Sequence, residues 1–201
     1  MTERTGTDTD TADAAVAHAF AHLHAEATTT LAGWSAPDAS QERLRAAYLD
    51  HLQRHPDGVA KAGPPAHLTA SCLVISPDGG QVLLTHHRRA KQWFQFGGHL
   101  EVDDTSLYAA AIREGREESG IPSVTPEPTI VQLNQHRLHG DFGRCREHLD
   151  VRYAAVVDPA VRPATSEESL DVAWWPADAL PEGTRTELTA LVDAARQALH
   201  H

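Results

Sequence analysis

The sequence lacks the features of a membrane or secreted protein. No apolar run approaches the roughly 20 residues that a membrane-spanning helix needs, and 22% of the residues are charged. The N-terminus, which reads "MTERTGTDTDTADAAVAHAF", has no basic segment followed by an apolar one, so it does not resemble a signal peptide. We therefore expect no membrane partner.

Cysteine and positive charge are also scarce. The two cysteines, Cys72 and Cys145, do not make a disulfide framework, so we predict a cytoplasmic location. The chain carries 17 Lys and Arg against 28 Asp and Glu, a formal net charge of −11. This argues against a nucleic-acid partner, which would require a basic face. An anionic small molecule remains compatible with this charge if metal ions neutralise its binding site.

The chain has no internal repeat, and its 201 residues suit one ordinary domain with an extension. We predict a disordered Thr- and Asp-rich tail over residues 1–12. Residues 13–66 are predicted to form an N-terminal helical extension, with one helix running from about Thr11 to Leu31 and a second beginning after Ser40 as its N-cap. An apolar stripe on the second helix means that it packs on something. Covering the sheet, capping a substrate cleft and forming a dimer interface all stay open.

A different pattern begins at His67. The runs "HLTASCLVIS" and "QVLLTHH" are typical of strands and are separated by "PDGG", which indicates a hairpin. Further strand-like runs are "QWFQF", "TIVQLNQHRL", "HLDVRYAAVV" and "LDVAWW", and the last segment, "ELTALVDAARQALHH", is helical in pattern. We therefore predict that residues 67–201 form an α+β domain in which strands surround one central helix.

That central helix lies in the stretch "GGHLEVDDTSLYAAAIREGREESGI", residues 97–121. Glu114, Glu117 and Glu118 are spaced i, i+3, i+4, so they share one face, and Arg113 lies four residues before Glu117. Like charges at this spacing repel one another, and a divalent cation would remove the repulsion. An R-E-x-x-E-E pattern alone is common on solvated helices. The glycine pair and acidic loop ahead of it favour a metal site instead.

The same stretch resembles the Nudix box, G-x5-E-x7-R-E-U-x-E-E-x-G-U, in which U is aliphatic. Gly98 matches the first glycine, and the segment from Arg113 to Ile121 matches the second half, with Gly115 in place of the aliphatic residue. The middle acid is Asp104, and eight residues rather than seven separate it from Arg113. The resemblance implies a Nudix-type α/β/α sandwich with a mixed sheet, plus the N-terminal helical extension.

The resemblance also implies a reaction. Nudix enzymes hydrolyse a nucleoside diphosphate linked to another moiety X, with Mg²⁺ or Mn²⁺ as cofactor. Carried over by position, Glu117 and Glu118 are metal ligands, and Glu114 binds metal directly or through water and helps to activate the attacking water. The carbonyl of Gly97 is a further ligand, and Arg113 orients a glutamate. The resemblance is compatible with a homodimer.

Residues outside the helix are weaker candidates. Arg88 and Trp93 precede the glycine pair, where a cation would contact phosphates and an aromatic ring would stack on a base. Many Nudix members use an additional acid, and the candidates are Glu147, Asp150, Glu167 and Glu168. We favour His148 and Asp150, which share one strand face. The candidate substrate-binding set is Arg88, Trp93, His99, His148, Asp150 and Glu168.

Two other functions remain open. One is a non-catalytic Nudix module that senses a nucleotide or binds a protein, although such modules often lose glutamates that this helix keeps. The other is isopentenyl-diphosphate isomerase, which has the same fold and needs a catalytic cysteine. Neither Cys72 nor Cys145 lies in a suitable local motif. X is undetermined among ADP-ribose, nucleoside triphosphates, dinucleoside polyphosphates, nucleotide sugars and coenzyme derivatives.

Overall fold

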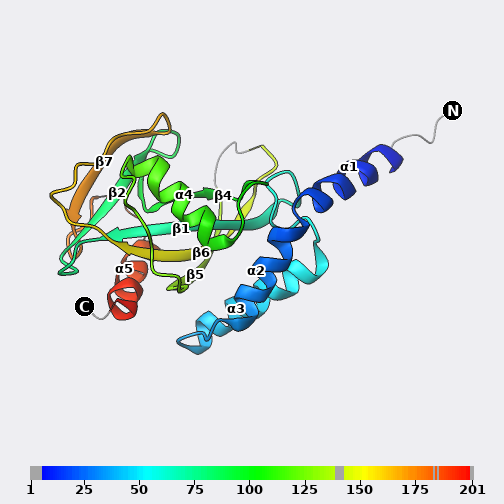
Figure 1. Cartoon of the computed structure of the whole chain (residues 1–201), viewed down its shortest axis with the longest axis horizontal. Coiled ribbons are helices and arrows are strands. Elements are labelled where there is room, and N and C mark those ends of the chain that lie inside the picture. The colour runs from blue at the N-terminus through cyan, green and yellow to red at the C-terminus, as the bar shows by residue number, and fades with distance from the viewer. Residues whose placement is uncertain (1–5, 139–142, 183, 185, 200–201) are drawn as a thin grey trace. The chain divides into compact units, whose positions relative to one another are not determined.

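The computed structural model describes residues 6–138, 143–182, 184 and 186–199 (Figure 1). Its helices are α1 (Gly6–Ala19), α2 (Ala21–Gly33), α3 (Ala39–Arg54), α4 (Leu107–Ser119) and α5 (Thr186–Ala198). Its strands are β1 (Ala66–Ile75), β2 (Gln81–His87), β3 (Trp93–Phe94), β4 (Phe96–His99), β5 (Gln132–Arg137), β6 (Glu147–Val156) and β7 (Ser169–Pro176). Among these described elements, no helix is long and apolar enough to cross a membrane.

The described strands form one seven-stranded sheet with the order β3-β2-β1-β6-β5, in which β4 also pairs with β1 and β7 with β2. The "PDGG" turn makes the predicted hairpin, since β1 and β2 pair antiparallel with Val74 opposite Leu83. The aromatic run predicted as one strand is two, β3 and β4, separated at Gln95. The prediction of a mixed sheet in a Nudix-type α/β/α sandwich is confirmed.

The described residues cluster into two compact units. Unit 1 takes its residues from Met1–Thr69, His99–Leu107 and Leu133–Asp150. Unit 2 takes its residues from Ala70–Gly98, Tyr108–Gln132 and Val151–His201.

Unit 2 buries both faces of its strands, because alternate side chains of a strand point to opposite sides. On one face, an apolar cluster joins strand residues to helix α5: Leu73, Ile75, Val82, Leu84, Leu188, Leu191, Val192 and Ala195. On the other face, Cys72, Val74 and Leu83 pack with Phe96, Ile121 and Val124. Helix α4 lies against this second cluster, since a Cβ on Gly115 would come within 2.9 Å of Val124 Cγ1 and 3.4 Å of Cys72 Cβ. The glycine in place of an aliphatic residue therefore lets α4 approach the sheet closely.

Unit 1 contains the N-terminal helices, and here the sequence predictions need correction. The single helix expected from Thr11 to Leu31 is two helices, α1 and α2, interrupted at Phe20. Asp38, rather than Ser40, is the N-cap of α3, because its carboxylate accepts hydrogen bonds from the amides of Ser40 and Gln41. Of the predicted disordered tail, residues 1–5 lie outside the described residues, whereas residues 6–12 belong to α1.

Candidate functional site

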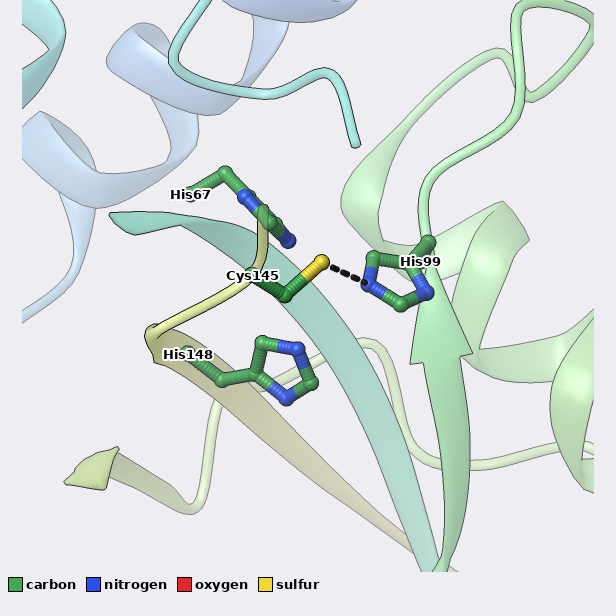
Figure 2. A group of neighbouring side chains, drawn as sticks. All are labelled: His67, His99, Cys145 and His148. Atoms are coloured by element: carbon green, nitrogen blue, oxygen red, sulfur yellow. Dashed lines mark hydrogen bonds between the residues drawn. The ribbon is translucent and has the colours of Figure 1, made fainter. Parts of the chain in front are cut away.

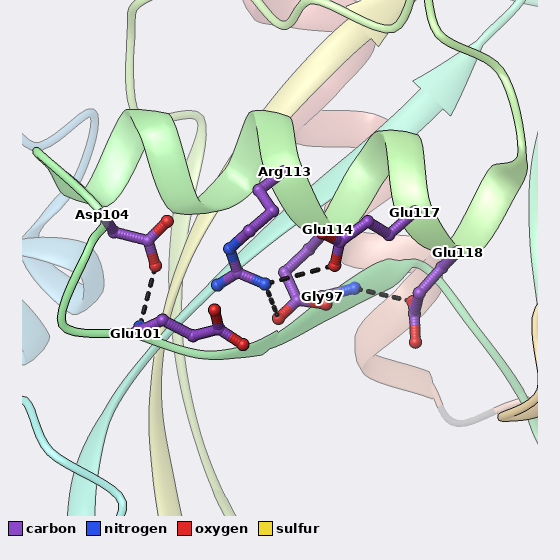
Figure 3. Close-up of polar contacts among 7 residues, drawn as sticks. All are labelled: Gly97, Glu101, Asp104, Arg113, Glu114, Glu117 and Glu118. Carbon is purple, nitrogen blue, oxygen red and sulfur yellow. Dashed lines mark hydrogen bonds and ion pairs between the residues drawn. The ribbon is translucent and has the colours of Figure 1, made fainter.

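The candidate site in unit 2 is built on α4 and the glycine backbone of β4. Figure 3 shows the glutamates of α4 on the helix face that looks toward the strand carrying Gly97. Glu118 Oε2 accepts a hydrogen bond of 3.0 Å from the Gly97 amide. Arg113 Nη1 donates to Glu114 Oε1 at 2.9 Å and lies 3.4 Å from Glu117 Oε2. The i, i+3, i+4 spacing thus places all three carboxylates along one margin of the helix.

Glu118 is buried and Glu114 is partly buried, with 14% of its side chain exposed, which is unusual for charged groups. Burial raises the pKa of Glu114 to about 7, although neighbouring Arg113 lowers it, and the charges of Glu117 and Glu168 raise it further. Burial raises the pKa of Glu118 to about 8, against the Gly97 hydrogen bond, with Glu114, Glu168 and Glu117 adding to the rise. The Glu117 side chain is 62% exposed. At neutral pH the buried carboxyls favour a proton or a cation between them.

The donors fit a hard divalent cation. Carboxylate and carbonyl oxygens are the ligands that Mg²⁺ takes in proteins, where it usually also contacts substrate phosphates. Glu114, Glu117 and Glu118 supply carboxylates, and the Gly97 carbonyl belongs to the backbone whose amide already holds Glu118. The chemistry of these donors on α4 and β4 therefore fits Mg²⁺ or Mn²⁺.

An acid from outside the helix acts on the same carboxylates. The charge of Glu168 raises the pKa of both Glu114 and Glu118. Arg88 holds this acid's segment in place, because its backbone amide donates to the Glu168 carbonyl at 2.8 Å. Its guanidinium donates to the carbonyls of Glu167 and Ser169 at 2.9 and 3.0 Å. Among the acids considered in sequence, Glu168 is therefore the one whose charge acts on both carboxyls.

Three other candidates from the sequence, Asp150, Trp93 and Arg88, make contacts with the protein itself in the structure. Asp150 lies in unit 1, where it is 3% exposed and accepts a hydrogen bond of 3.0 Å from Thr69 Oγ1. Trp93 packs against the apolar cluster of α5, with its ring stacked 5.0 Å from His86 and edge-on to Trp175 at 5.3 Å. The Arg88 guanidinium is engaged with backbone carbonyls. These contacts give Trp93 a packing role and Arg88 a positioning role.

His99 and His148 lie together in a group that the sequence analysis did not foresee. In unit 1, His67, His99, Cys145 and His148 each offer one ligand atom, and these atoms lie within 4.8 Å of one another. The sequence holds one local signal for this group, the C-x-x-H spacing of Cys145 and His148. His67 and His99 are 32 or more positions away from their nearest partner in the group, so no local pattern links them.

The two glycines of β4 differ in what surrounds them, which allows a paired prediction. A Cβ on Gly97 would lie 2.4 Å from Ser71 Cβ and 2.8 Å from the Ala70 carbonyl oxygen, both on the neighbouring strand. A Cβ on Gly98 would lie 2.6 Å from Glu114 Oε1, the end of a flexible side chain. Gly97→Ala should lower the melting temperature clearly, since overpacking typically costs about 1–3 kcal/mol.

Gly98→Ala should leave the melting temperature nearly unchanged and displace the Glu114 carboxylate instead. We expect at least about a tenfold loss of any metal-dependent turnover, as about 1.4 kcal/mol of lost transition-state stabilisation gives. Thermal melts and turnover of both variants are the measurements. Equal stability losses with unchanged turnover in Gly98→Ala would contradict the placement of Glu114.

Comparison with known proteins agrees with the fold. The NUDIX domain family model matches residues 65–196. The chain therefore belongs to the Nudix family. A comparison with curated protein sequences gives no match.

Solved structures show the same fold. A NUDIX-family hydrolase from Clostridium perfringens is 25% identical with a TM-score of 0.52, over 66% of this chain and 97% of that one. The NUDIX domain of NrtR from Shewanella oneidensis, in complex with ADP ribose, is 25% identical with a TM-score of 0.50, over 66% and 87% of the two chains. An Ap4A hydrolase from C. elegans is 16% identical with a TM-score of 0.51, over 66% and 97%.

Proposed function

We propose that this chain is a Mg²⁺- or Mn²⁺-dependent pyrophosphohydrolase that cleaves a nucleoside diphosphate linked to another moiety by water attack on phosphorus. The observation that carries the proposal is a pair of carboxyls, buried Glu118 and partly buried Glu114, beside the glycine backbone of β4. Burial raises the pKa of Glu114 to about 7 and of Glu118 to about 8. Such an arrangement is unfavourable for folding alone and favourable for holding a cation.

The chain's own residues then have distinct roles. Glu117, Glu118 and the Gly97 carbonyl would hold the cation, while the Gly97 amide keeps the Glu118 carboxylate in its rotamer. Arg113 orients Glu114 through a hydrogen bond of 2.9 Å, so that Glu114 can accept a proton from the attacking water. When bound, the cation would neutralise charge on the diphosphate. Phosphoryl chemistry requires mainly such positioning and charge neutralisation.

The substrate class is a nucleotide derivative. The neighbours include an Ap4A hydrolase and a NUDIX domain in complex with ADP ribose. These support a panel of ADP-ribose, dinucleoside polyphosphates, nucleoside triphosphates and nucleotide sugars. We would incubate purified full-length protein with each compound and Mg²⁺ or Mn²⁺, with and without EDTA, and identify products by mass. Metal-dependent release of a nucleoside monophosphate from one strong substrate is the expected result.

A second candidate, a nucleotide-binding module without catalysis, is favoured by the NrtR NUDIX domain at 25% identity with its ADP ribose. The same panel separates the two functions. Saturable binding of a compound in a calorimeter, with no turnover of it in either metal, would favour the module. The isomerase hypothesis fits less well, because Cys72 is fully buried and burial raises its pKa to about 12. A thiol in that state is a poor catalytic acid or nucleophile.

The positioning role of Arg88 leads to a prediction with a matched control. Arg88→Ala removes the hydrogen bonds to the carbonyls of Glu167 and Ser169, whereas Arg89→Ala removes the same charge one residue away. If Arg88 holds Glu168 near the site, Arg88→Ala should lower kcat about tenfold or more, with KM changed less.

Glu168→Gln should produce a similar loss of kcat, and combining it with Arg88→Ala should add little. Steady-state kinetics of the four variants would check this. A loss as large in Arg89→Ala would point to the charge of the segment rather than to the position of Glu168.

A further inference from the structure

Four side chains of metal-ligating types converge in unit 1, and none of them belongs to α4. His67 lies on β1, His99 ends β4, Cys145 precedes β6 and His148 lies on β6. Figure 2 shows the four side chains pointing toward a common centre. Their ligand atoms lie within 4.8 Å of one another, and Cys145 Sγ is 3.8 Å from His99 Nε2. In a tetrahedral zinc site, bonds of about 2.0–2.3 Å place ligand atoms about 3.3–3.7 Å apart. Small side-chain rotations would therefore close the group around one ion.

The hydrogen bond of His67 orients its ring for metal binding through Nε2. His67 is 0% exposed, and its Nδ1 lies 3.0 Å from the carbonyl oxygen of Pro64. A carbonyl only accepts, so Nδ1 carries the proton and Nε2 presents its lone pair. Both His67 Nε2 and His148 Nε2 are buried, and neither has a hydrogen-bond partner among the described residues. Metal-bound histidines usually donate their second ring nitrogen to such a carbonyl. A buried acceptor left unsatisfied is destabilising, and a bound ion would remove that cost.

Neutral imidazole is the form that binds metal, and burial favours it over the charged form. Burial lowers the pKa of His99 to about 3 and of His148 to about 4, and it also lowers the pKa of His67. The facing charged and titratable groups are Lys61 and His136, which act in the same direction, and Asp150, which raises the pKa of His148. A bound cation would be repelled by the positive charge of Lys61, and the thiolate that Cys145 forms on metal binding would supply the compensating negative charge.

The donor set selects the kind of ion. Three imidazoles and one thiolate suit zinc and similar transition metals, whereas Mg²⁺ takes oxygen ligands. Four protein ligands also fill a tetrahedral shell, which is the pattern of structural sites; catalytic zinc keeps one position open.

We propose that His67, His99, Cys145 and His148 bind one zinc-class ion as a structural centre of unit 1. The ion joins β1, the end of β4 and the segment that enters β6, three parts of the chain that are distant in sequence. Because His99 directly follows Gly98, an ion bound to His99 also anchors the chain immediately after the glycine pair. The proposal does not depend on the hydrolase function.

The test is metal binding by the full-length protein without an affinity tag. Metal analysis should find about one zinc per chain, and Co²⁺ added to metal-free protein should give a tetrahedral visible spectrum with a thiolate-to-cobalt charge-transfer band. Cys145→Ser should remove that band, and His67→Ala should weaken Co²⁺ binding at least about a hundredfold, above the tenfold to hundredfold typical of outer-shell changes. These readouts require no turnover, so they are independent of the proposed hydrolase.

His136→Ala is the matched control, because the His136 ring lies 5.3 Å from His148 outside the four-residue group. It should keep one equivalent of Co²⁺ and the same spectrum, and so should Glu118→Gln. Absence of the charge-transfer band in the wild-type protein would overturn the proposal without reference to any variant. Unchanged Co²⁺ binding in folded Cys145→Ser and His67→Ala would overturn it as well.

Discussion

Glu118→Gln is expected to abolish most metal-dependent hydrolysis and yet stabilise the metal-free protein at alkaline pH. Glutamine keeps an oxygen that can accept the 3.0 Å hydrogen bond from the Gly97 amide but removes the buried charge. Loss of a carboxylate proposed to bind the cation should reduce kcat at least about a thousandfold, which is about 4 kcal/mol of transition-state stabilisation. The stability gain has the same cause as the loss of activity, the burial of a charge.

The pH dependence follows from the direction of the pKa shift. Folding raises the pKa of Glu118 from 4.5 to about 8. Its favourable contribution is therefore fully present below about pH 4.5 and is lost as the pH rises toward 8. Each pKa unit corresponds to about 1.4 kcal/mol, and 1 kcal/mol shifts the melting temperature of a chain this size by about 2–4 °C. Metal-free Glu118→Gln should melt at least about 3 °C above wild type at pH 8.5, with little difference at pH 4.5.

Glu117→Gln is the control for this prediction. Its side chain is 62% exposed, so its melting temperature should follow that of wild type at both pH values. Its turnover should still fall if Glu117 binds the cation. The measurements are melting curves of both variants in EDTA at the two pH values, and their kinetics in Mg²⁺. Destabilisation of Glu118→Gln at pH 8.5, or full activity in both variants, would contradict the assignment.

Removing the transition metal is expected to lower the melting temperature of the wild-type protein by about 10 °C. An ion present at a thousand times its dissociation constant stabilises the folded state by about 4 kcal/mol. At about 2–4 °C of melting temperature per kcal/mol, this corresponds to a shift of about 10 °C. A chelator with nitrogen donors, added in the presence of excess Mg²⁺, would remove zinc from His67, His99, Cys145 and His148 while keeping Mg²⁺ available. Zinc, and not more Mg²⁺, should restore the original melting temperature.

Cys145→Ser serves as the reference for this measurement. Its melting temperature should already be low and should respond little to the chelator, because the fourth ligand is missing. His136→Ala should respond as wild type does. A wild-type protein whose melting temperature does not change after complete zinc removal would show that the centre contributes nothing to stability.

The predictions from sequence that held were local ones. Spacing along α4 places Glu114, Glu117 and Glu118 on one margin, because a helix turns by about 100° per residue whatever surrounds it. The hairpin at "PDGG" follows from its turn residues in the same way. The prediction of one helix from Thr11 to Leu31 was wrong because two adjacent helices, α1 and α2, share one alanine-rich composition, and the break at Phe20 carries no proline or glycine.

What the sequence by itself determined is therefore the Nudix class, the carboxylate helix and the glycine backbone before it, since their spacing lies within one short stretch. Only the tertiary structure decided the rest. Glu168 reaches the electrostatic environment of α4 from some 50 residues further along the chain, with Arg88 holding its segment. His67, His99, Cys145 and His148 meet because sheet pairing and loops bring distant positions together. Such proximity depends on the packing of the whole chain, and no local spacing encodes it.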